Sequence, residues 1–224
     1  MSQRPIAVSR APHPLSRGAA TRLRWPHPER AAIVAIAASA GGIPAISRIL
    51  SGLPRDYPIP IVLVLHRGAS VPTALPRILA RETLLAVKLA EAGEALRPAT
   101  VYVAPADRHM LIDEDGRLQL MDGRKIKFVS SSANPLFDSA AAVLGGQVIA
   151  VVLTGGGSNG TDGVQAIKAT GGVVIAQDPV TAAHGGMPSA AIASGAVDYV
   201  LELGDIAPAL IALGGEGAPD HAAR

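Results

Sequence analysis

Apolar residues in this chain fall mainly into short uninterrupted runs that alternate with segments of helical spacing. The runs are aliphatic, as in strands buried on both faces of a parallel sheet, and they cover 31–39, 59–66, 147–154 and 172–178. Helical spacing predicts helices over 43–53, 71–83, 135–146, 160–171, 187–195 and 204–213, with a short strand over 197–203. This alternation predicts a single α/β domain with a doubly wound, mostly parallel, Rossmann-like sheet.

The middle of the chain has a different pattern. Its apolar segments are shorter and are separated by Gly, Pro and the turn sequence DEDG at 113–116. Short apolar segments interrupted by turn-forming residues are typical of small strands joined by tight turns. The sequence therefore predicts a small β-hairpin excursion around residues 88–121.

The two ends of the chain lack the apolar periodicity of the rest. Residues 1–30 are rich in Pro and carry six Arg against one acid. The positive charge of this segment alone therefore exceeds the +2 net charge of the whole chain. We predict a flexible Arg/Pro-rich arm over 1–30, a catalytic-type domain over 31–213 and a disordered tail over 214–224. The chain has no cysteine, no secretory signal and no apolar run of about 18 residues, so we expect a cytoplasmic protein without membrane insertion.

Candidate chemistry stands where predicted strands end, since sites of doubly wound sheets lie there. Ser39 follows the first strand and is followed by Ala40-Gly41-Gly42, and His66 ends the second strand. A serine activated by a histidine, next to free backbone N–H groups, is the arrangement of a serine hydrolase. The alternatives are a Ser39 that caps the following helix and a His66 that is only a buried structural residue. The histidines and acids show no metal-ligand spacing, so no metal is predicted.

A glycine-rich loop, VVLTGGGSNGTDGV at 151–164, allows two interpretations. Gly155, Gly157 and Gly160 form G-x-G-x-x-G between a strand and a helix, and Asp178 follows at the distance of a ribose-binding acid, as in dinucleotide-binding domains. Against this interpretation, a dinucleotide fold normally opens with that motif, whereas here it lies two-thirds of the way along the chain. The loop can instead be the third corner of a hydrolase site.

Five segments resemble the chemotaxis protein-glutamate methylesterases, the catalytic domain of CheB. They are VAIAASAGGIPAI (34–46), IVLVLHRG (61–68), APADRHM (104–110), VVLTGGGSNGTDG (151–163) and AHGGMPSAAIASGAVDYV (183–200). The resemblance spans about residues 31–213 in the order of the family. It favours the hydrolase interpretation of the glycine loop over a bound dinucleotide.

Carried over position by position, the resemblance implies a role for each candidate residue. Ser39 becomes the nucleophile and His66 the general base, and the carboxylate that orients the histidine falls on Asn159. The backbone N–H groups of Ala40 and Gly156 would form the oxyanion hole. His109 and Met187 would line the cleft.

The implied function is hydrolysis of glutamyl methyl esters, or deamidation of glutamine, on methylated chemoreceptor-type proteins. The resemblance implies no cofactor, and the short basic patch DGRKIK is too small to predict a nucleic-acid partner.

The sequence departs from the family at several positions, and Asn159 is the most important. An amide carries no charge to stabilise a protonated His66. Four consequences stay open: a catalytically impaired binding module in a signalling pathway, an Asn that works as in Cys-His-Asn sites, a substitute carboxylate from Asp162, or conversion of Asn159 to Asp by deamidation of the Asn159-Gly160 dipeptide. Asp162 also suits the first turn of the next helix, where a negative charge complements the helix dipole.

Other departures concern the lining of the site and its regulation. Gly156 stands where the family usually has Met, Ala40 where it usually has a polar residue, and SSSAN (130–134) where it tends to have R-P-S-V-D. These changes predict a looser loop and weaker recognition of the usual glutamyl ester. The resemblance begins at residue 31, so we expect no receiver domain ahead of it.

Overall fold

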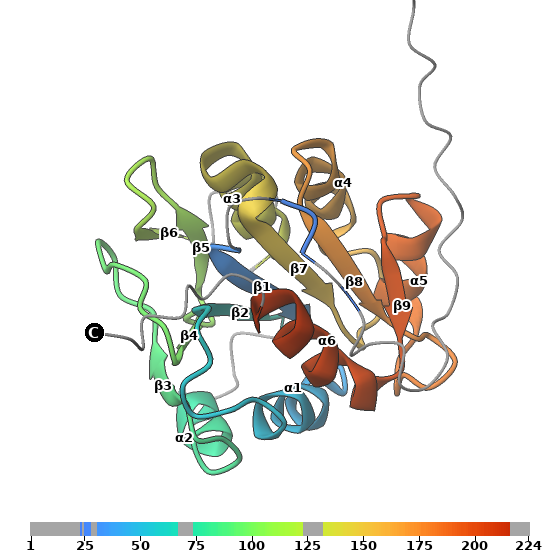
Figure 1. Cartoon of the computed structure of the whole chain (residues 1–224), viewed down its shortest axis with the longest axis horizontal. Coiled ribbons are helices and arrows are strands. Elements are labelled where there is room, and N and C mark those ends of the chain that lie inside the picture. The colour runs from blue at the N-terminus through green and yellow to red at the C-terminus, as the bar shows by residue number, and fades with distance from the viewer. Residues whose placement is uncertain (1–22, 24, 28–30, 67–73, 123–131, 216–224) are drawn as a thin grey trace, which may run out of the picture.

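The structure is a computed structural model, and it describes residues 23, 25–27, 31–66, 74–122 and 132–215. Within them, seven strands form one parallel sheet in the order β3-β4-β2-β1-β7-β8-β9 (Figure 1). Their bounds are β1 (Ile33–Ala38), β2 (Ile61–Leu65), β3 (Ala86–Leu89), β4 (Thr100–Val103), β7 (Val148–Val152), β8 (Val173–Gln177) and β9 (Tyr199–Leu201). The predicted doubly wound, mostly parallel sheet is confirmed.

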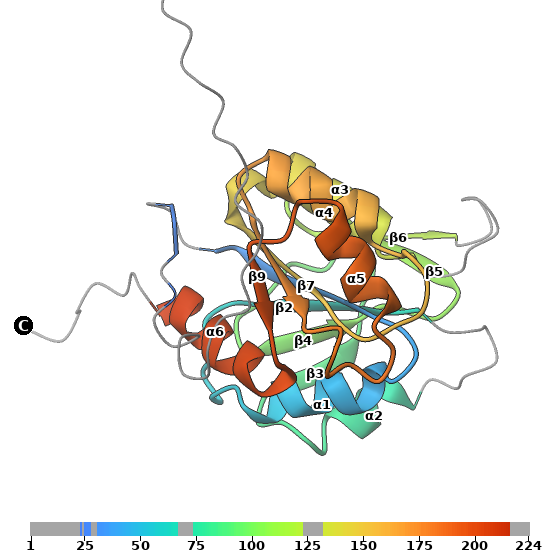
Figure 2. The same cartoon turned by 90° about the vertical axis from the view of Figure 1, so that its right-hand side faces the viewer.

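Helices cover both faces of this sheet. Their bounds are α1 (Gly42–Ser51), α2 (Leu75–Leu79), α3 (Asn134–Leu144), α4 (Thr161–Ala169), α5 (Gly186–Ala193) and α6 (Leu203–Gly215), with a 3₁₀ turn at Gly145–Gln147. One apolar core lies under α1, α2 and α6, and a second lies under α3, α4 and α5 (Figure 2). None of the described helices is long and apolar enough to cross a membrane.

Strand β1 is the centre of the fold. It pairs with β2 on one side and with β7 on the other, and all three strands are buried along their whole length. The chain winds outward from β1 through β2, and later returns to the opposite side of β1 through β7. A crevice forms at the carboxyl ends of the strands where the winding direction changes, so the loops after β1, β2 and β7 are the natural place for a site.

The hairpin excursion is smaller than predicted. Strands β3 and β4 belong to the parallel sheet, and only β5 (Arg108–Ile112) and β6 (Leu118–Asp122) form an antiparallel hairpin, which packs against α3. The edge strand β3 is short and only half-buried, so its sequence lacks the aliphatic run that identifies the central strands. The helix predicted over 71–83 is likewise reduced to α2, and 71–73 lie outside the described residues.

Part of the predicted N-terminal arm packs onto the domain. Leu23 and Trp25 are buried in the core that contains α6, and the His27 ring lies 2.6 Å from the carbonyl oxygen of Gly171. Residues 1–22 of the predicted arm lie outside the described residues. The packed unit therefore begins before residue 31, and at the other end α6 continues to Gly215.

Truncating Trp25 tests this docking. We expect Trp25→Ala to lower the free energy of unfolding by about 3 kcal/mol, the loss that follows removal of a large buried aromatic ring. Pro26→Ala is the matched control, because Pro26 is exposed and its substitution should change stability by less than about 0.5 kcal/mol. Urea denaturation measures both values, and equal effects of the two variants would contradict the docking.

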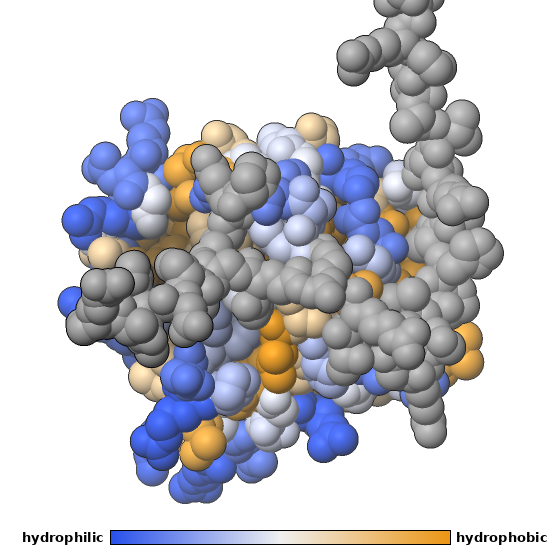
Figure 3. Space-filling view, in the orientation of Figure 1, coloured by the Kyte–Doolittle hydropathy of each residue, from blue (hydrophilic) through white to orange (hydrophobic). Residues whose placement is uncertain are grey.

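The surface on the face seen in Figure 1 is mostly polar. Figure 3 shows strongly hydrophilic residues along the left and lower edges of this face and a small apolar area near α6. Ile211 of α6 is 40% exposed, whereas most of the apolar side chains of that helix are buried.

Candidate active site

Ser39 is fixed by backbone hydrogen bonds at the carboxyl end of β1. Its N–H donates to the carbonyl of Thr154, 3.0 Å away, and its carbonyl accepts from the N–H of Gly42 at 2.9 Å. Gly41 has a left-handed backbone conformation, with φ of 75°, which turns the chain sharply into α1. The N-cap of α1 is Gly41, without a side-chain hydrogen bond, so the Ser39 hydroxyl is not used as a helix cap.

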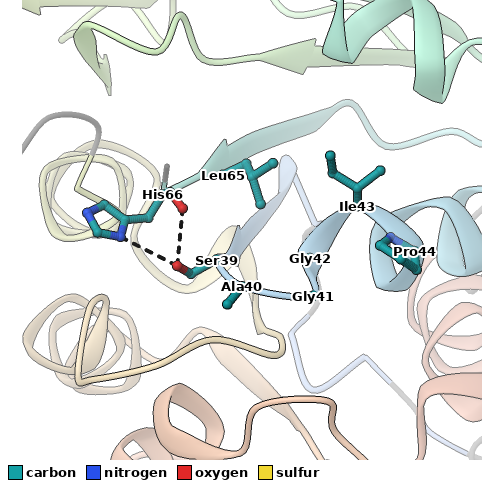
Figure 4. A pocket seen from close by; sticks show the side chains of 8 residues that line it. All are labelled: Ser39, Ala40, Gly41, Gly42, Ile43, Pro44, Leu65 and His66. Carbon is teal, nitrogen blue, oxygen red and sulfur yellow. Dashed lines mark hydrogen bonds between the residues drawn. The ribbon is translucent and has the colours of Figure 1, made fainter. Parts of the chain in front are cut away.

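The Ser39 hydroxyl faces His66, which follows the adjacent strand β2. Ser39 Oγ lies 3.5 Å from His66 Nδ1 and donates to the His66 backbone carbonyl at 3.1 Å (Figure 4). The His66 N–H donates to the carbonyl of Ala38 at 2.8 Å, which fixes the backbone that carries the ring. The two residues predicted to act together are therefore adjacent, with the serine proton directed at the carbonyl and the ring nitrogen at the outer limit of a hydrogen bond.

Two open cavities meet at His66. The first, of about 390 Å³, is lined by Ser39, His66 and mainly apolar residues that include Ile43 and Leu65. The second, of about 460 Å³, is more polar and is lined by the loop that contains Asn159. His66 therefore lies between the cavity that contains Ser39 and the cavity lined by the glycine loop.

Asn159 is held by the start of helix α3. Its side-chain oxygen Oδ1 accepts a hydrogen bond from Ser132 Oγ and another from the Ala133 N–H, both at 3.0 Å. Its Nδ2 group is buried and has no hydrogen-bond partner among the described residues. Donors at a helix N-terminus require an acceptor, so these contacts orient the amide with its oxygen toward α3.

This orientation determines what Asn159 can offer to His66. A carbonyl oxygen has two lone pairs, and both are used by Ser132 and Ala133. Asn159 can therefore contact the imidazole only as an N–H donor. A neutral imidazole that accepts a hydrogen bond on one nitrogen carries its proton on the other nitrogen. A hydrogen bond from Asn159 would therefore place the proton on the nitrogen that faces Ser39, and that nitrogen could not act as the base.

Asp162 occupies the first turn of α4, as predicted for its structural role. Its side chain is exposed, and its Oδ2 lies 3.5 Å from Asn134 Nδ2. Partial burial, together with the charge of Asp162, raises the pKa of Asp138. Asp162 lines the second cavity but makes no hydrogen bond to His66 within the described residues.

Two backbone N–H groups near Ser39 are free to bind a negative oxygen. Neither the Ala40 N–H nor the Gly156 N–H donates to another group in the described part of the chain. The neighbouring groups are occupied: the Gly155 N–H donates to the carbonyl of His184, and the Gly155 carbonyl accepts from the Met187 N–H. The loop is therefore pinned at Gly155, and its next residue keeps an unused donor.

Gly155 and Gly156 differ in the space around them, which gives a matched pair of variants. A Cβ on Gly155 would lie 2.2 Å from the sulfur of Met187 and 2.9 Å from the Cβ of Ser39, whereas a Cβ on Gly156 would meet nothing within 4 Å. We expect Gly155→Ala to destabilise the fold by about 1–3 kcal/mol. Gly156→Ala should stay within about 0.5 kcal/mol of the wild type in thermal unfolding. An equal loss in both variants would contradict the close packing of Met187 on the loop.

The two predicted cleft-lining residues, His109 and Met187, are buried. His109 is on strand β5 rather than in a loop, is completely buried, and accepts a hydrogen bond from the Ser132 N–H at 3.2 Å through Nδ1. Met187 is buried, with its sulfur against Gly155. Neither residue is among those that line the two cavities at His66, and their place in the cleft stays a prediction. Packing, rather than exposure, explains their positions.

Sequence reasoning misses the residues that hold Asn159. Ser132 and Ala133 lie in SSSAN, which the sequence marks only as a departure from the family; Ser130 and Ser131 lie outside the described residues. The following Asn134 accepts from the Gly163 N–H at 3.2 Å and so ties α3 to α4. A Ser/Asn cluster directly before a predicted helix is the available signal, because such residues satisfy free backbone N–H groups.

A domain that brings a serine and a histidine together at the carboxyl ends of adjacent parallel strands has the arrangement of a serine hydrolase. Residues 34–210 match the family model described as CheB methylesterase. The chain belongs to the CheB methylesterase family, and its enzyme class is that of the carboxylic ester hydrolases.

Individual relatives agree with this assignment. A protein of Leptospira interrogans is 41% identical over 180 residues, an alignment that covers 80% of this chain and 93% of the relative. The protein-glutamate methylesterase/protein-glutamine glutaminase 2 of Anaeromyxobacter dehalogenans is 41% identical over 82% of this chain, which spans only 54% of that longer protein. The crystal structure of the Thermotoga maritima CheB methylesterase catalytic domain has a TM-score of 0.77 and 37% identity, and the alignment covers 83% of this chain and all of that domain.

Proposed function

We propose that this protein hydrolyses glutamyl methyl esters, and by the same chemistry deamidates glutamine, on methylated chemoreceptor-type proteins. The observation that carries the proposal is the pairing of Ser39 and His66, whose Oγ and Nδ1 atoms lie 3.5 Å apart beside an open cavity. The relative from Anaeromyxobacter dehalogenans is named protein-glutamate methylesterase/protein-glutamine glutaminase 2, which supports the choice of substrate. The cytoplasmic location remains a prediction from the sequence.

The proposed reaction begins with attack of Ser39 Oγ on the ester carbonyl carbon. The hydroxyl must first rotate from the His66 carbonyl to the ring, and Nδ1 then takes its proton. The negative oxygen of the tetrahedral intermediate would bind the free N–H groups of Ala40 and Gly156. Methanol leaves with the proton from His66, or ammonia leaves from a glutamine substrate. Water then attacks the acyl-enzyme with the same base and releases glutamate.

Asn159 sets the expected rate of this reaction. Its oxygen is used by the start of α3, so it cannot accept a hydrogen bond from His66. The imidazole therefore lacks the anionic partner that fixes the productive tautomer and stabilises its protonated form. We expect slow turnover in the unmodified protein, with the nucleophile and base in place.

A catalytically impaired binding module is the second candidate, and the occupied oxygen of Asn159 is the observation that favours it. In that case the cleft would bind the receptor segment without cleaving the ester. Binding to an immobilised methylated peptide would then be unchanged in Ser39→Ala, and no variant would release methanol. If the protein is an esterase, Ser39→Ala should also keep peptide binding, but the wild type should release methanol and Ser39→Ala should not.

The direct test is release of methanol from a peptide that carries a glutamyl methyl ester. The same peptide with free glutamate is the control for background methanol. We expect methanol release that depends on protein concentration and disappears in Ser39→Ala. Methanol release that is unaffected by loss of the Ser39 hydroxyl would contradict the proposed function, because the nucleophile would lie elsewhere.

A further inference from the structure

We propose that Asn159-Gly160 is a self-modifying site, at which Asn159 loses ammonia and becomes the aspartate that the Ser39–His66 pair lacks. This inference rests on the proposed function for its biological meaning, but the chemical step does not depend on it. Three features of the described structure carry it: the state of the Gly160 nitrogen, the two donors on Asn159 Oδ1, and the unpartnered Nδ2 group.

The first feature is the nucleophile. In this reaction the backbone nitrogen of Gly160 attacks the side-chain carbon Cγ of Asn159 and closes a five-membered imide. Glycine has no Cβ to hinder that approach. The Gly160 N–H donates to no other described group, so no hydrogen bond has to break before the nitrogen can attack.

The second feature is activation of the amide. The Ser132 hydroxyl and the Ala133 N–H both donate to Asn159 Oδ1 at 3.0 Å. During attack the negative charge develops on this same oxygen. Two fixed donors, one of them at the N-terminus of α3, act on it as an oxyanion hole acts on an ester oxygen.

The third feature is the leaving group. Nδ2 is buried and has no hydrogen-bond partner in the described part of the chain, so its departure as ammonia breaks no hydrogen bond there. The Gly160 N–H proton is lost to water, and a proton from water is taken up by the leaving amide nitrogen. Asn159 also lines the open cavity of about 460 Å³, which gives water access to the imide.

Water then opens the imide at either of its two carbonyl carbons. Attack at the side-chain carbonyl restores the original backbone and leaves aspartate, and attack at the backbone carbonyl leaves isoaspartate with one extra CH₂ in the main chain. In the aspartate product, one oxygen keeps the hydrogen bonds from Ser132 and Ala133. The other oxygen replaces Nδ2, and since Asn159 and His66 line the same cavity it would be an acceptor available to the imidazole. The modification would therefore activate the enzyme with age.

The test follows the conversion of residue 159 by peptide mapping during incubation of the folded protein. An isolated peptide of residues 151–164 contains the same dipeptide without α3. We expect faster conversion in the folded protein than in the peptide, with aspartate as a product and esterase activity that rises in step with it. A folded protein that converts no faster than the peptide would overturn the inference.

Two serine variants separate the effect of the structure from that of the sequence. Ser132→Ala removes one donor from Oδ1 and should slow conversion by at least about tenfold, because losing one oxyanion-hole donor costs about 10²–10³ in rate in an enzyme. Ser158→Ala is the matched control. Ser158 is the residue directly before Asn159, and its hydroxyl makes no hydrogen bond within the described residues. This variant should leave the rate of conversion unchanged. Equal rates in the two variants would also overturn the inference.

The Asn159→Asp variant tests the proposed function independently of the self-modification. If that variant cleaves the ester and the wild type stays amidated, only the self-modification is wrong. If the wild type converts and neither form cleaves the ester, the modification is confirmed as chemistry and the proposed esterase function is wrong.

Discussion

The Ser39→Ala variant is expected to lose nearly all ester hydrolysis. In the Asn159→Asp background, where the site is complete, we expect kcat to fall by about 10⁴- to 10⁶-fold, because removing the nucleophile leaves only binding and the oxyanion hole. In the unmodified protein the fall should be smaller, about 10²-fold or more. The residues of such a site act as a unit, and the unmodified protein already has a lower kcat because Asn159 stands in place of the acid.

The measurement is single-substrate kinetics on a small activated ester and on the methylated peptide. Ser39 Oγ makes its only described contacts with His66, so Ser39→Ala should unfold at the same temperature as the wild type. Ser51→Ala is a matched control at the far end of α1, where the hydroxyl only donates to the carbonyl of Arg48. If Ser39→Ala kept more than a tenth of the activity in both backgrounds, Ser39 would not be the nucleophile.

The Asn159→Asp variant is expected to raise kcat/KM by about 10²–10⁴-fold. The reverse change at this role in serine proteases lowers turnover about 10⁴-fold through the wrong tautomer of the histidine. Here the two donors to Oδ1 can hold one carboxylate oxygen in the same place. The second oxygen then replaces Nδ2 beside the cavity that His66 also lines, and we expect it to accept a hydrogen bond from the imidazole.

Asp162→Asn is the control for this prediction. Asp162 lines the same cavity but is exposed and contacts Asn134. Replacing its carboxylate by an amide should therefore change kcat/KM by less than about threefold. A large loss in Asp162→Asn, with no gain in Asn159→Asp, would mean that Asp162 supplies the carboxylate. Peptide mapping of each preparation is needed, because prior conversion of Asn159 would hide the gain.

The sequence is sufficient to predict the sheet and to single out Ser39 and His66 as candidate residues. Aliphatic runs identify strands that are buried on both faces, and strand ends meet at one edge of a parallel sheet, so the sequence singles out Ser39 and His66 as a candidate pair. The resemblance to the CheB methylesterases then implies their roles. The weakly apolar edge strand β3 does not carry this signal, which is why its residues are predicted as part of the hairpin. Trp25 falls in the predicted flexible arm because one buried aromatic residue leaves no periodicity.

The orientation of Asn159 cannot be predicted from sequence. It depends on Ser132 and Ala133, which are 26 or 27 positions away along the chain and reach Asn159 only because α3 packs against α4. The burial of His109 has the same kind of cause, since β5 packs on α3 and turns this side chain inward. Local patterns place residues on elements, whereas contacts between elements determine which atoms meet.

The central claim is that Ser39 is a nucleophile activated by His66, and covalent trapping tests it most directly. The protein would be incubated with an activated phosphonate that forms a stable ester with nucleophilic serines, and the adduct would be located by peptide mapping. We expect an adduct on Ser39, formed faster in Asn159→Asp and absent from the His66→Ala variant. An unlabelled Ser39, or a label whose rate does not depend on His66, would contradict it.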